Sequence, residues 1–372
     1  MQRVAVVVGA RPNFVKVAPV CDALRAEPDI AVEILHTGQH YDRSLSGAFL
    51  EQLGLPEPTH HLGVGSGTQA AQTAAVIAGV EAVLAPDPPA AMVVPGDVNS
   101  TLGATLAAAK LGVPVAHLEA GLRSGDRTMP EEINRIITDR LAELLLVHCD
   151  DAVDNLRREG VPDAAIALVG NTMIDSLLHL LPAARATGAV ERLGLQRGGF
   201  VLVTLHRPSL VDEPARLAAV LDVLDTAAAQ LPVVFPVHPR TRARLDDAGL
   251  APRAVRLLEP LDYLDFIALE AEARLVVTDS GGLQEETSAL GVPCLTFRST
   301  TERPITCALG TNRLVGIDPV ALGGAIAAEL AAPRRPAPPP IPLWDGHAGP
   351  RAAAAVAALA RRRAGVAAAP VG

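Results

Sequence analysis

Three acidic residues in the N-terminal half of the sequence could carry out acid–base chemistry. Asp97 and Glu119 each follow an apolar, strand-like run, and Glu131 comes directly after Pro130. Each also has an ordinary explanation, because polar residues form turns after strands and acids are favoured in the first turn of a helix. Three carboxylates brought together in one site would favour general acid–base catalysis.

Basic residues occur at comparable positions. Arg11 and Lys16 flank the passage from the first apolar run into a helical pattern, a place where anions are often bound. Arg135 lies four residues after Glu131, so a plain surface ion pair is an alternative to a site role. Solvated surface charge also explains Arg11 and Lys16 when each is taken alone.

In the C-terminal half, His206 and Arg207 follow one strand-like run, and His238 follows another. A single histidine is more often a structural residue than a catalyst. Two histidines at equivalent strand ends favour a functional site only modestly, and they would add donor or cationic groups there.

The segment Asp279-Ser280-Gly281-Gly282 is a candidate phosphate-binding loop. Small residues let backbone N–H groups approach a ligand, and N–H groups at a helix start suit a phosphate or diphosphate. Glu286, about one turn further on, could accept hydrogen bonds from two ribose hydroxyls. Ser-Gly-Gly also forms ordinary turns, so this loop alone is weak evidence. Neither a Walker loop nor the dinucleotide fingerprint is present, and no nicotinamide cofactor is expected.

The elements that must position these residues alternate between strands and helices. Apolar runs predict buried parallel strands at 4–8, 32–36, 92–95, 113–118 and 144–148, and again at 200–205, 233–237, 275–278 and 293–297. This alternation predicts an α/β fold with two Rossmann-like, doubly wound domains. Ligands bind beyond the carboxyl ends of such strands, so we expect the polar residues to gather there and the two domains to face one cleft.

We expect three parts along the chain. The first domain covers 1–170 and carries the acids, and the second covers 171–342. A Pro-rich stretch then leads into 343–372, whose Ala- and Arg-rich pattern predicts a helix that packs back on the first domain.

Composition narrows the function classes. The chain has 372 residues, with 32 Lys and Arg against 41 Asp and Glu, a net charge of −9 and only 2% aromatic residues. This argues against nucleic acid or a membrane as the main partner. Four cysteines without C-x-x-C spacing indicate neither a zinc cluster nor a disulfide scaffold, and reduced thiols are expected instead. No signal peptide or membrane span is recognised, so a cytoplasmic location is expected.

Several segments together resemble the non-hydrolysing UDP-N-acetylglucosamine 2-epimerase family. They occur in the family's order and spacing to about residue 316, which is far more specific than any single motif. The segments are GARPNFVK at 9–16, TGQHYD at 37–42, GDVNST at 96–101, the run at 117–135, VGNTMID at 169–175, TLHRP at 204–208, PVHPR at 236–240, TDSGGLQEE at 278–286 and TTERP at 300–304. The resemblance implies the glycosyltransferase-B-type fold.

The resemblance also implies an activity, the reversible epimerisation of UDP-GlcNAc at C2 to give UDP-ManNAc. In the family, UDP is eliminated to leave a 2-acetamidoglucal, and UDP then adds back with the opposite configuration at C2. No cofactor or metal is implied, and a homodimer is expected. The resemblance assigns catalytic roles to Asp97, Glu119, Glu131, Lys16 and His206. It assigns substrate or UDP binding to Arg11, Ser280, Gly281, Glu286 and Arg303. From their positions in the sequence, the same role is expected for Arg135, Arg207, His238 and Gly282.

One departure concerns regulation. Some bacterial members bind a second UDP-GlcNAc as an activator through Gln and Arg side chains. Here Gln39 is retained, but Asp42 and Thr68 stand where those members have Gln and Arg. We therefore expect weak or absent activation by substrate, which hyperbolic initial rates in UDP-GlcNAc would reveal.

Three other functions compete with this interpretation. A hydrolysing relative would release UDP and free ManNAc, a glycosyltransferase would need an acceptor, and a non-catalytic sensor would bind UDP-sugar without turnover. The joint presence of Asp97, Glu119 and Glu131 argues against the last two.

Overall fold

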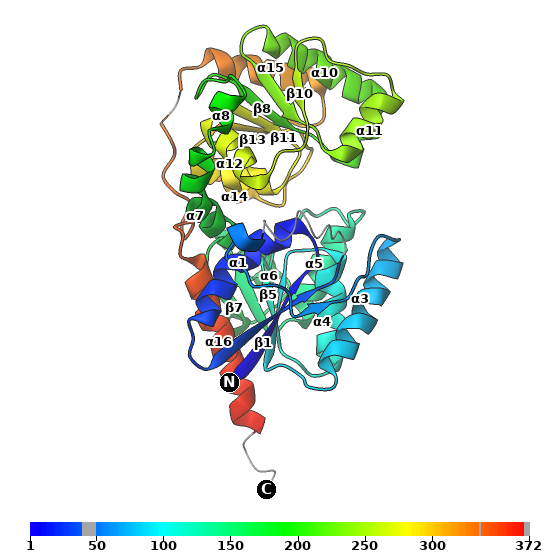
Figure 1. The fold of residues 1–372 in the computed structure, drawn as a ribbon, viewed down its shortest axis with the longest axis vertical. Coiled ribbons are helices and arrows are strands. Elements are labelled where there is room, and N and C mark those ends of the chain that lie inside the picture. The colour runs from blue at the N-terminus through cyan, green and yellow to red at the C-terminus, as the bar shows by residue number, and fades with distance from the viewer. Residues whose placement is uncertain (39–49, 335, 368–372) are drawn as a thin grey trace. The chain divides into compact units, whose positions relative to one another are not determined.

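The computed structural model describes residues 1–38, 50–334 and 336–367 (Figure 1). The chain divides into two compact units. The first contains Met1–Ser176 and Pro342–Gly372, and the second contains Leu177–Ile341.

The first unit is built on a parallel sheet in the order β3-β2-β1-β4-β5-β6-β7. Its strands are β1 Gln2–Val8, β2 Ile30–His36, β3 His60–His61, β4 Ala91–Pro95, β5 Val115–Leu118, β6 Leu144–Val147 and β7 Ile166–Leu168. The continuous apolar runs of β1 and β4 are almost wholly buried, as expected for strands covered on both faces. Strand order reverses between β1 and β4, and ligands of such sheets bind beside that reversal.

Helices cover both faces of this sheet (Figure 1). They are α1 Arg11–Arg25, α3 Gln69–Leu84, α4 Asn99–Lys110, α5 Pro130–Leu141, α6 Asp150–Arg158, the start of α7 Thr172–Ala186, and α16 Ala348–Ala367. Helices α3 and α4 pack closely because Gly103 has no side chain. A Cβ there would lie 2.8 Å from the Val76 side chain.

The C-terminal segment belongs to the first unit. Its helix α16 packs along α1, and Gly349 lies so close to Pro19 that a Cβ would come within 2.6 Å of it. The Gly349 N–H donates to Asp175 at 2.7 Å, and the Trp344 Nε1–H donates to the carbonyl oxygen of His148 at 2.9 Å. These buried contacts fix where the helix begins.

The second unit repeats the design with a parallel sheet in the order β10-β9-β8-β11-β12-β13. Its strands are β8 Val201–Thr204, β9 Val233–Pro236, β10 Arg256–Leu258, β11 Leu275–Thr278, β12 Cys294–Thr296 and β13 Asn312–Leu314. Its helices are α8 Ala189–Arg192, α9 Pro208–Val211, α10 Pro214–Ala228, α11 Pro239–Asp247, α12 Tyr263–Glu272, α13 Gly282–Leu290, α14 Pro304–Ala308 and α15 Pro319–Ala331, together with the end of α7. Here the order reverses between β8 and β11.

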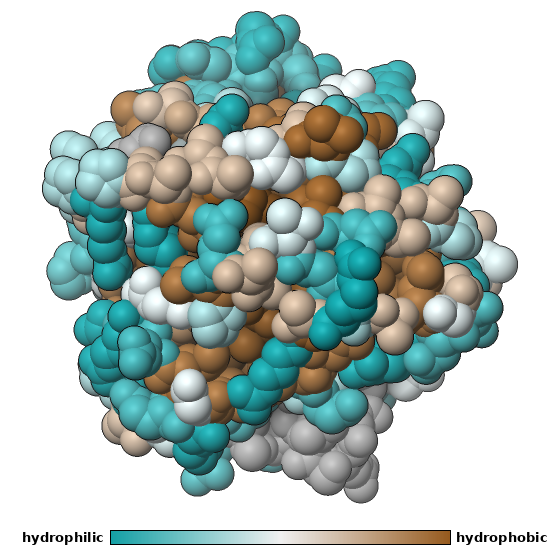
Figure 2. Space-filling model, turned by 90° about the horizontal axis from the view of Figure 1, so that it is seen from above, coloured by the Kyte–Doolittle hydropathy of each residue, from teal (hydrophilic) through white to brown (hydrophobic). Residues whose placement is uncertain are grey.

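The predicted fold class, α/β with two doubly wound parallel sheets, is confirmed. Across the described ranges, no helix has both the length and the apolar character needed to cross a membrane. Figure 2 shows one face of the molecule, on which polar and apolar side chains are interspersed. The four cysteines are free, with Cys307 exposed and the other three buried.

Candidate active site

Two acids of the first unit emerge side by side at the carboxyl edge of its sheet. Asp97 follows β4 and Glu119 follows β5, and these strands pair with Pro95 opposite Leu118. The Lys16 ammonium, from the first turns of α1, forms an ion pair with Glu119. A Cβ at Gly96 would lie 3.2 Å from both charged groups, so a residue without a side chain is needed between them.

Asp97 has a cationic partner of its own. The Arg135 guanidinium, whose side chain is only 3% exposed, forms ion pairs with Asp97 and with Glu132, the latter at 2.9 Å. The Asn134 side-chain N–H donates to the Asp97 carbonyl oxygen at 2.8 Å. Both groups come from α5, so this helix fixes the backbone and the carboxylate of Asp97 together.

Glu131 and Glu132 have different surroundings. Glu131 is half-buried in the first turn of α5, and no described side-chain contact involves it. Glu132 is buried and accepts hydrogen bonds from the backbone N–H groups of Ser124 and Gly125, each at 2.9 Å. Burial raises the pKa of Glu132, but these hydrogen bonds and Arg135 outweigh burial and hold the pKa below its ordinary value. Sequence reasoning missed Glu132, for which the three-residue spacing to Arg135 was the available signal.

Glu119 has an unusual backbone conformation. Its φ is 71°, the left-handed region that non-glycine residues rarely occupy. Its N–H donates to the Leu146 carbonyl oxygen at 3.1 Å, so the neighbouring strand β6 holds the conformation in place. Strain of this kind clusters at functional sites and is consistent with a carboxylate aimed for chemistry.

In the second unit, a buried carboxylate organises the reversal between β8 and β11. Asp279 is 1% exposed and accepts hydrogen bonds from the backbone N–H groups of His206 at 2.9 Å and Arg207 at 2.8 Å. The His206 Nδ1 also lies 3.1 Å from this carboxylate. The His238 ring stands 5.7 Å from the His206 ring, centroid to centroid. Burial, followed by the nearby His206 and Arg240, lowers the pKa of His238.

The Ser280-Gly281-Gly282 loop lies against Arg303. A Cβ at Gly281 would come 2.6 Å from an Arg303 Nη1, so glycine is needed for this approach. Arg303 forms ion pairs with Glu285 at 2.9 Å and with Glu302 at 3.2 Å. The two buried acids thereby hold the guanidinium beside the loop.

Glu286 is 5% exposed on α13, and the Tyr263 hydroxyl donates to its carboxyl group at 3.2 Å. Burial raises its pKa to about 7, with a further increase from Glu285 and an opposing effect from the Tyr263 hydrogen bond. Glu270 lies near Glu286 and is also buried, and neither of its carboxyl oxygens has a hydrogen-bond partner. Burial and the nearby Glu286 raise the pKa of Glu270 well above its ordinary value.

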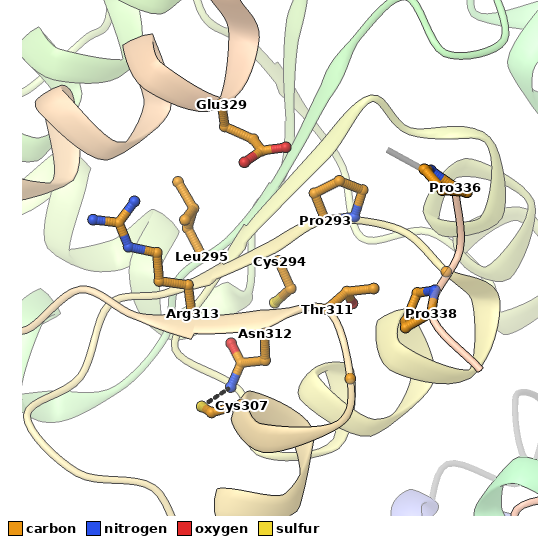
Figure 3. Close-up of a pocket in the computed structure, with 12 residues that line it drawn as sticks. Pro293, Cys294, Leu295, Cys307, Thr311, Asn312, Arg313, Glu329, Pro336 and Pro338 are labelled. Carbon is orange, nitrogen blue, oxygen red and sulfur yellow. Dashed lines mark hydrogen bonds between the residues drawn. The ribbon is translucent and has the colours of Figure 1, made fainter. Parts of the chain in front are cut away.

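Two cavities of the second unit lie at opposite edges of its sheet. One, of about 230 Å³, lies at the carboxyl edge and is lined by Thr204, Leu205, His206, Pro236, Val237, His238, Pro239, Pro260, Leu261, Phe266, Ser280 and Leu283. The other, of about 400 Å³, lies where β12 and β13 begin (Figure 3). Of the predicted site residues, His206, His238 and Ser280 line the first cavity, and none lines the second.

The structure therefore sorts the predicted site residues into two groups. The first unit brings together Asp97, Glu119, Lys16 and Arg135, with Glu131 on the same helix as Arg135. The second unit brings together His206, Arg207, His238, Ser280, Gly281, Gly282 and Arg303, with Glu286 further along α13. Arg11 begins α1, and its side chain lies outside the described part of the structure, as do Gln39 and Asp42. Thr68 caps α3 by accepting from the Ala71 N–H at 3.3 Å.

Among the described residues, no cluster of His, Cys, Asp and Glu has the arrangement of a metal site. The cationic groups of the second unit suit an anionic ligand, and the paired acids of the first unit suit proton transfer.

The family model for UDP-N-acetylglucosamine 2-epimerase matches residues 22–357. The chain belongs to this family. It is accordingly an enzyme of the epimerase class. It is 40% identical over 329 residues to a UDP-N-acetylglucosamine 2-epimerase of Methanocaldococcus jannaschii, covering 84% of this chain and 88% of the relative. It is also 42% identical over 320 residues to a UDP-2,3-diacetamido-2,3-dideoxy-D-glucuronate 2-epimerase of Pseudomonas aeruginosa, with the same coverage of 84% and 88%.

Solved structures of this epimerase family have the same fold. The Methanocaldococcus jannaschii UDP-GlcNAc 2-epimerase in complex with UDP-GlcNAc and UDP matches with a TM-score of 0.87 and 37% identity, over 96% of this chain and 100% of that one. The Neisseria meningitidis enzyme bound to UDP-GlcNAc matches with a TM-score of 0.85 and 28% identity, over 97% and 100%. The predicted glycosyltransferase-B-type fold is confirmed by these family members.

Proposed function

We propose that this protein catalyses the reversible epimerisation of UDP-GlcNAc at C2, giving UDP-ManNAc without release of free sugar. The observation that carries the proposal is the pairing of Asp97 with Arg135 and of Glu119 with Lys16 at adjacent strand ends. Removing the weakly acidic proton at C2 requires a positioned base, and an ion pair holds each carboxylate in one orientation.

The chemistry we propose has two halves. In the first, a carboxylate takes the proton from C2, the bond between C1 and the diphosphate oxygen breaks, and UDP leaves a 2-acetamidoglucal. In the second, a proton is delivered to the opposite face of C2 and the diphosphate oxygen bonds to C1 again. Asp97, Glu119 and Glu131 supply the proton-transferring groups. Lys16 and His206 stabilise negative charge as it develops on the departing diphosphate.

We assign the UDP contacts to the second unit and to Arg11. Arg207, Arg303 and the backbone N–H groups of the Ser280-Gly281-Gly282 loop would bind the diphosphate. Asp279 holds the Arg207 backbone, and Glu285 and Glu302 hold the Arg303 guanidinium beside the loop. The cavity of about 230 Å³ beside His238 and Phe266 is mostly apolar and suits a planar pyrimidine ring.

Glu286 gives this proposal a pH dependence. A ribose would donate hydrogen bonds to its carboxylate, whereas the carboxyl group, with its pKa raised to about 7, is neutral in more acidic solution. We therefore expect KM for the UDP-sugar to fall about tenfold between about pH 6 and pH 8, because binding then requires no loss of a proton. Initial rates measured across this range test the expectation.

Two variants sharpen that test. Glu286→Gln should raise KM and abolish its dependence on pH. Glu270→Gln, the same substitution at a neighbouring buried acid, should leave the dependence in place. A pH dependence that survives in Glu286→Gln would contradict the assignment of this residue to the ribose.

The folding stability should depend on pH in the opposite sense to substrate binding, because it should decrease as pH rises. Because the folded protein binds this proton more tightly, the contribution of Glu286 to stability is present below about pH 4.5 and is lost as pH rises past about 7.

The Pseudomonas aeruginosa relative favours a second candidate substrate, UDP-2,3-diacetamido-2,3-dideoxy-D-glucuronate. Both sugars carry the 2-acetamido group beside the acidic C2 proton, so the same acids could act on either. A direct comparison of kcat/KM for the two nucleotide sugars distinguishes them.

Proton NMR of the protein with UDP-GlcNAc in D2O tests the main proposal. Growth of UDP-ManNAc signals with deuterium entering at C2 would establish the epimerase reaction. Free ManNAc accumulating faster than UDP-ManNAc would instead establish a hydrolysing enzyme, and UDP binding without turnover would establish a sensor.

We further propose that the protein forms a homodimer. We also propose that it is located in the cytoplasm, because the four free cysteines are compatible with a reducing compartment.

A further inference from the structure

A fully buried histidine lies beneath the acids of the first unit. His117 is on β5, two residues before Glu119, and its ring is 0% exposed. Its Nδ1 lies 2.6 Å from Oδ1 of Asp139, and its Nε2 lies 2.7 Å from the carbonyl oxygen of Gly96. Asp139 is on α5 and is also buried. The ring therefore connects β5, helix α5 and the turn that carries Asp97.

Both neighbours of this ring are hydrogen-bond acceptors. A carboxylate and a backbone carbonyl offer only lone pairs, so each ring nitrogen of His117 must carry a hydrogen. A neutral imidazole has one N–H, which would leave a nitrogen lone pair facing an oxygen at hydrogen-bond distance. With Asp139 ionised beside the Arg123 guanidinium, both short contacts are hydrogen bonds when the ring is doubly protonated and positively charged.

The charged groups around His117 are consistent with a positively charged ring. Asp139 also receives the Arg123 guanidinium at 2.7 Å, and Arg123 in turn pairs with Glu159 at 2.7 Å. Two cations and two carboxylates, from β5, the segment between β5 and α5, α5 and the residue after α6, thus form one network. On the far side of Gly96 stand Lys16 and Glu119, which neutralise each other, and Arg135 pairs with Asp97.

The same network holds both catalytic turns. Through Nε2, His117 anchors the carbonyl of Gly96, the residue directly before Asp97. Through Oδ2, Asp139 accepts the Gly121 N–H at 3.1 Å, two residues after Glu119. Gly121 is tightly enclosed, because a Cβ there would lie 2.5 Å from the Ala152 carbonyl oxygen. A shift of the His117–Asp139 pair would therefore move both acids.

We propose that His117 is a positioning residue whose ring carries a hydrogen on both nitrogens and which, with Asp139, sets the relative placement of Asp97 and Glu119. It touches no reacting atom, and it acts through the Gly96 carbonyl. The inference deepens the proposed function and depends on it, because placing the two acids matters only if they transfer protons.

The charge state of His117 can be measured without substrate. In protein labelled with ¹⁵N-histidine, the His117 signals are identified by their loss in a His117→Gln variant. We expect both ring nitrogens to show the chemical shifts of N–H groups at neutral pH. One unprotonated ring nitrogen at neutral pH would overturn the inference. The protonation of the His117 ring is measured without substrate and does not depend on which reaction the enzyme catalyses. A negative result would therefore contradict the inference about His117 but not the proposed function.

Two matched variants test the positioning role. The amide nitrogen of Gln falls near Nε2 of histidine and that of Asn near Nδ1, so His117→Gln keeps a donor for Gly96 and His117→Asn keeps one for Asp139. We expect His117→Asn to lower kcat about 100-fold and His117→Gln to lower it about tenfold, with KM within about twofold in both. Equal losses in the two variants, or losses that follow their thermal stabilities, would show a merely structural role.

Discussion

Asp97→Asn should lower kcat for C2 epimerisation by about 10²–10⁴-fold, with little change in KM. The amide cannot take a proton from C2, while its size and its placement after β4 are unchanged. The fold should survive, because Arg135 keeps its ion pair with Glu132 at 2.9 Å when the Asp97 charge is removed. Loss of C2–H exchange into D2O, followed by proton NMR, measures the effect directly.

The matched control for this variant is Asp87→Asn. Asp87 is also an acid of the first unit paired with an arginine, Arg3, but its side chain is 80% exposed. We expect wild-type kcat in this control, because exposed pairs contribute little. If Asp97→Asn retains most of the wild-type kcat while its fold is intact, the proposed acid–base role of Asp97 is wrong.

Arg303→Met should destabilise the second unit by about 3–5 kcal/mol, since removing one partner of a buried ion pair leaves an uncompensated charge. The Arg303 side chain is 7% exposed, and its partners Glu285 and Glu302 are 1% and 2% exposed. Glu302 retains Arg298 at 2.8 Å, so the loss falls mainly on Glu285. Urea unfolding followed by circular dichroism would show the decrease as a lower midpoint.

Two further variants isolate the cause. Arg313→Met changes an exposed arginine of the same unit and should leave the urea midpoint within error. The double variant Glu285→Gln with Arg303→Met removes the stranded charge and should recover much of the lost stability. No recovery in the double variant would mean that Arg303 stabilises the unit through packing rather than through charge.

The broad architecture could be predicted from local pattern. Strand β1 was expected at 4–8 and is Gln2–Val8, and β4 was expected at 92–95 and is Ala91–Pro95. Continuous apolar runs that alternate with helical patterns have few alternatives to a parallel sheet covered on both faces. Parallel strands bring their carboxyl ends to one edge, so the closeness of Asp97 and Glu119 followed from their places after β4 and β5.

Short edge strands were not predicted. Strands β3, β7, β10 and β13 contain only two or three residues, and β3 is His60–His61. Such strands exist because a neighbouring backbone supplies hydrogen bonds, and they carry almost no hydrophobic pattern. Propensity and periodicity therefore gave no signal for them.

The sequence by itself determined the two α/β domains, the family and the residue types offered at each strand end. Only the tertiary structure decided which charges meet. It paired Arg135 with Glu132 and Asp97, placed Asp279 under the backbone of His206 and Arg207, and set His117 between Asp139 and Gly96. The physical reason is that a buried polar group needs a hydrogen-bond partner, and the fold can supply one from a residue far away in the sequence. Asp279 and His206, for example, are 73 residues apart.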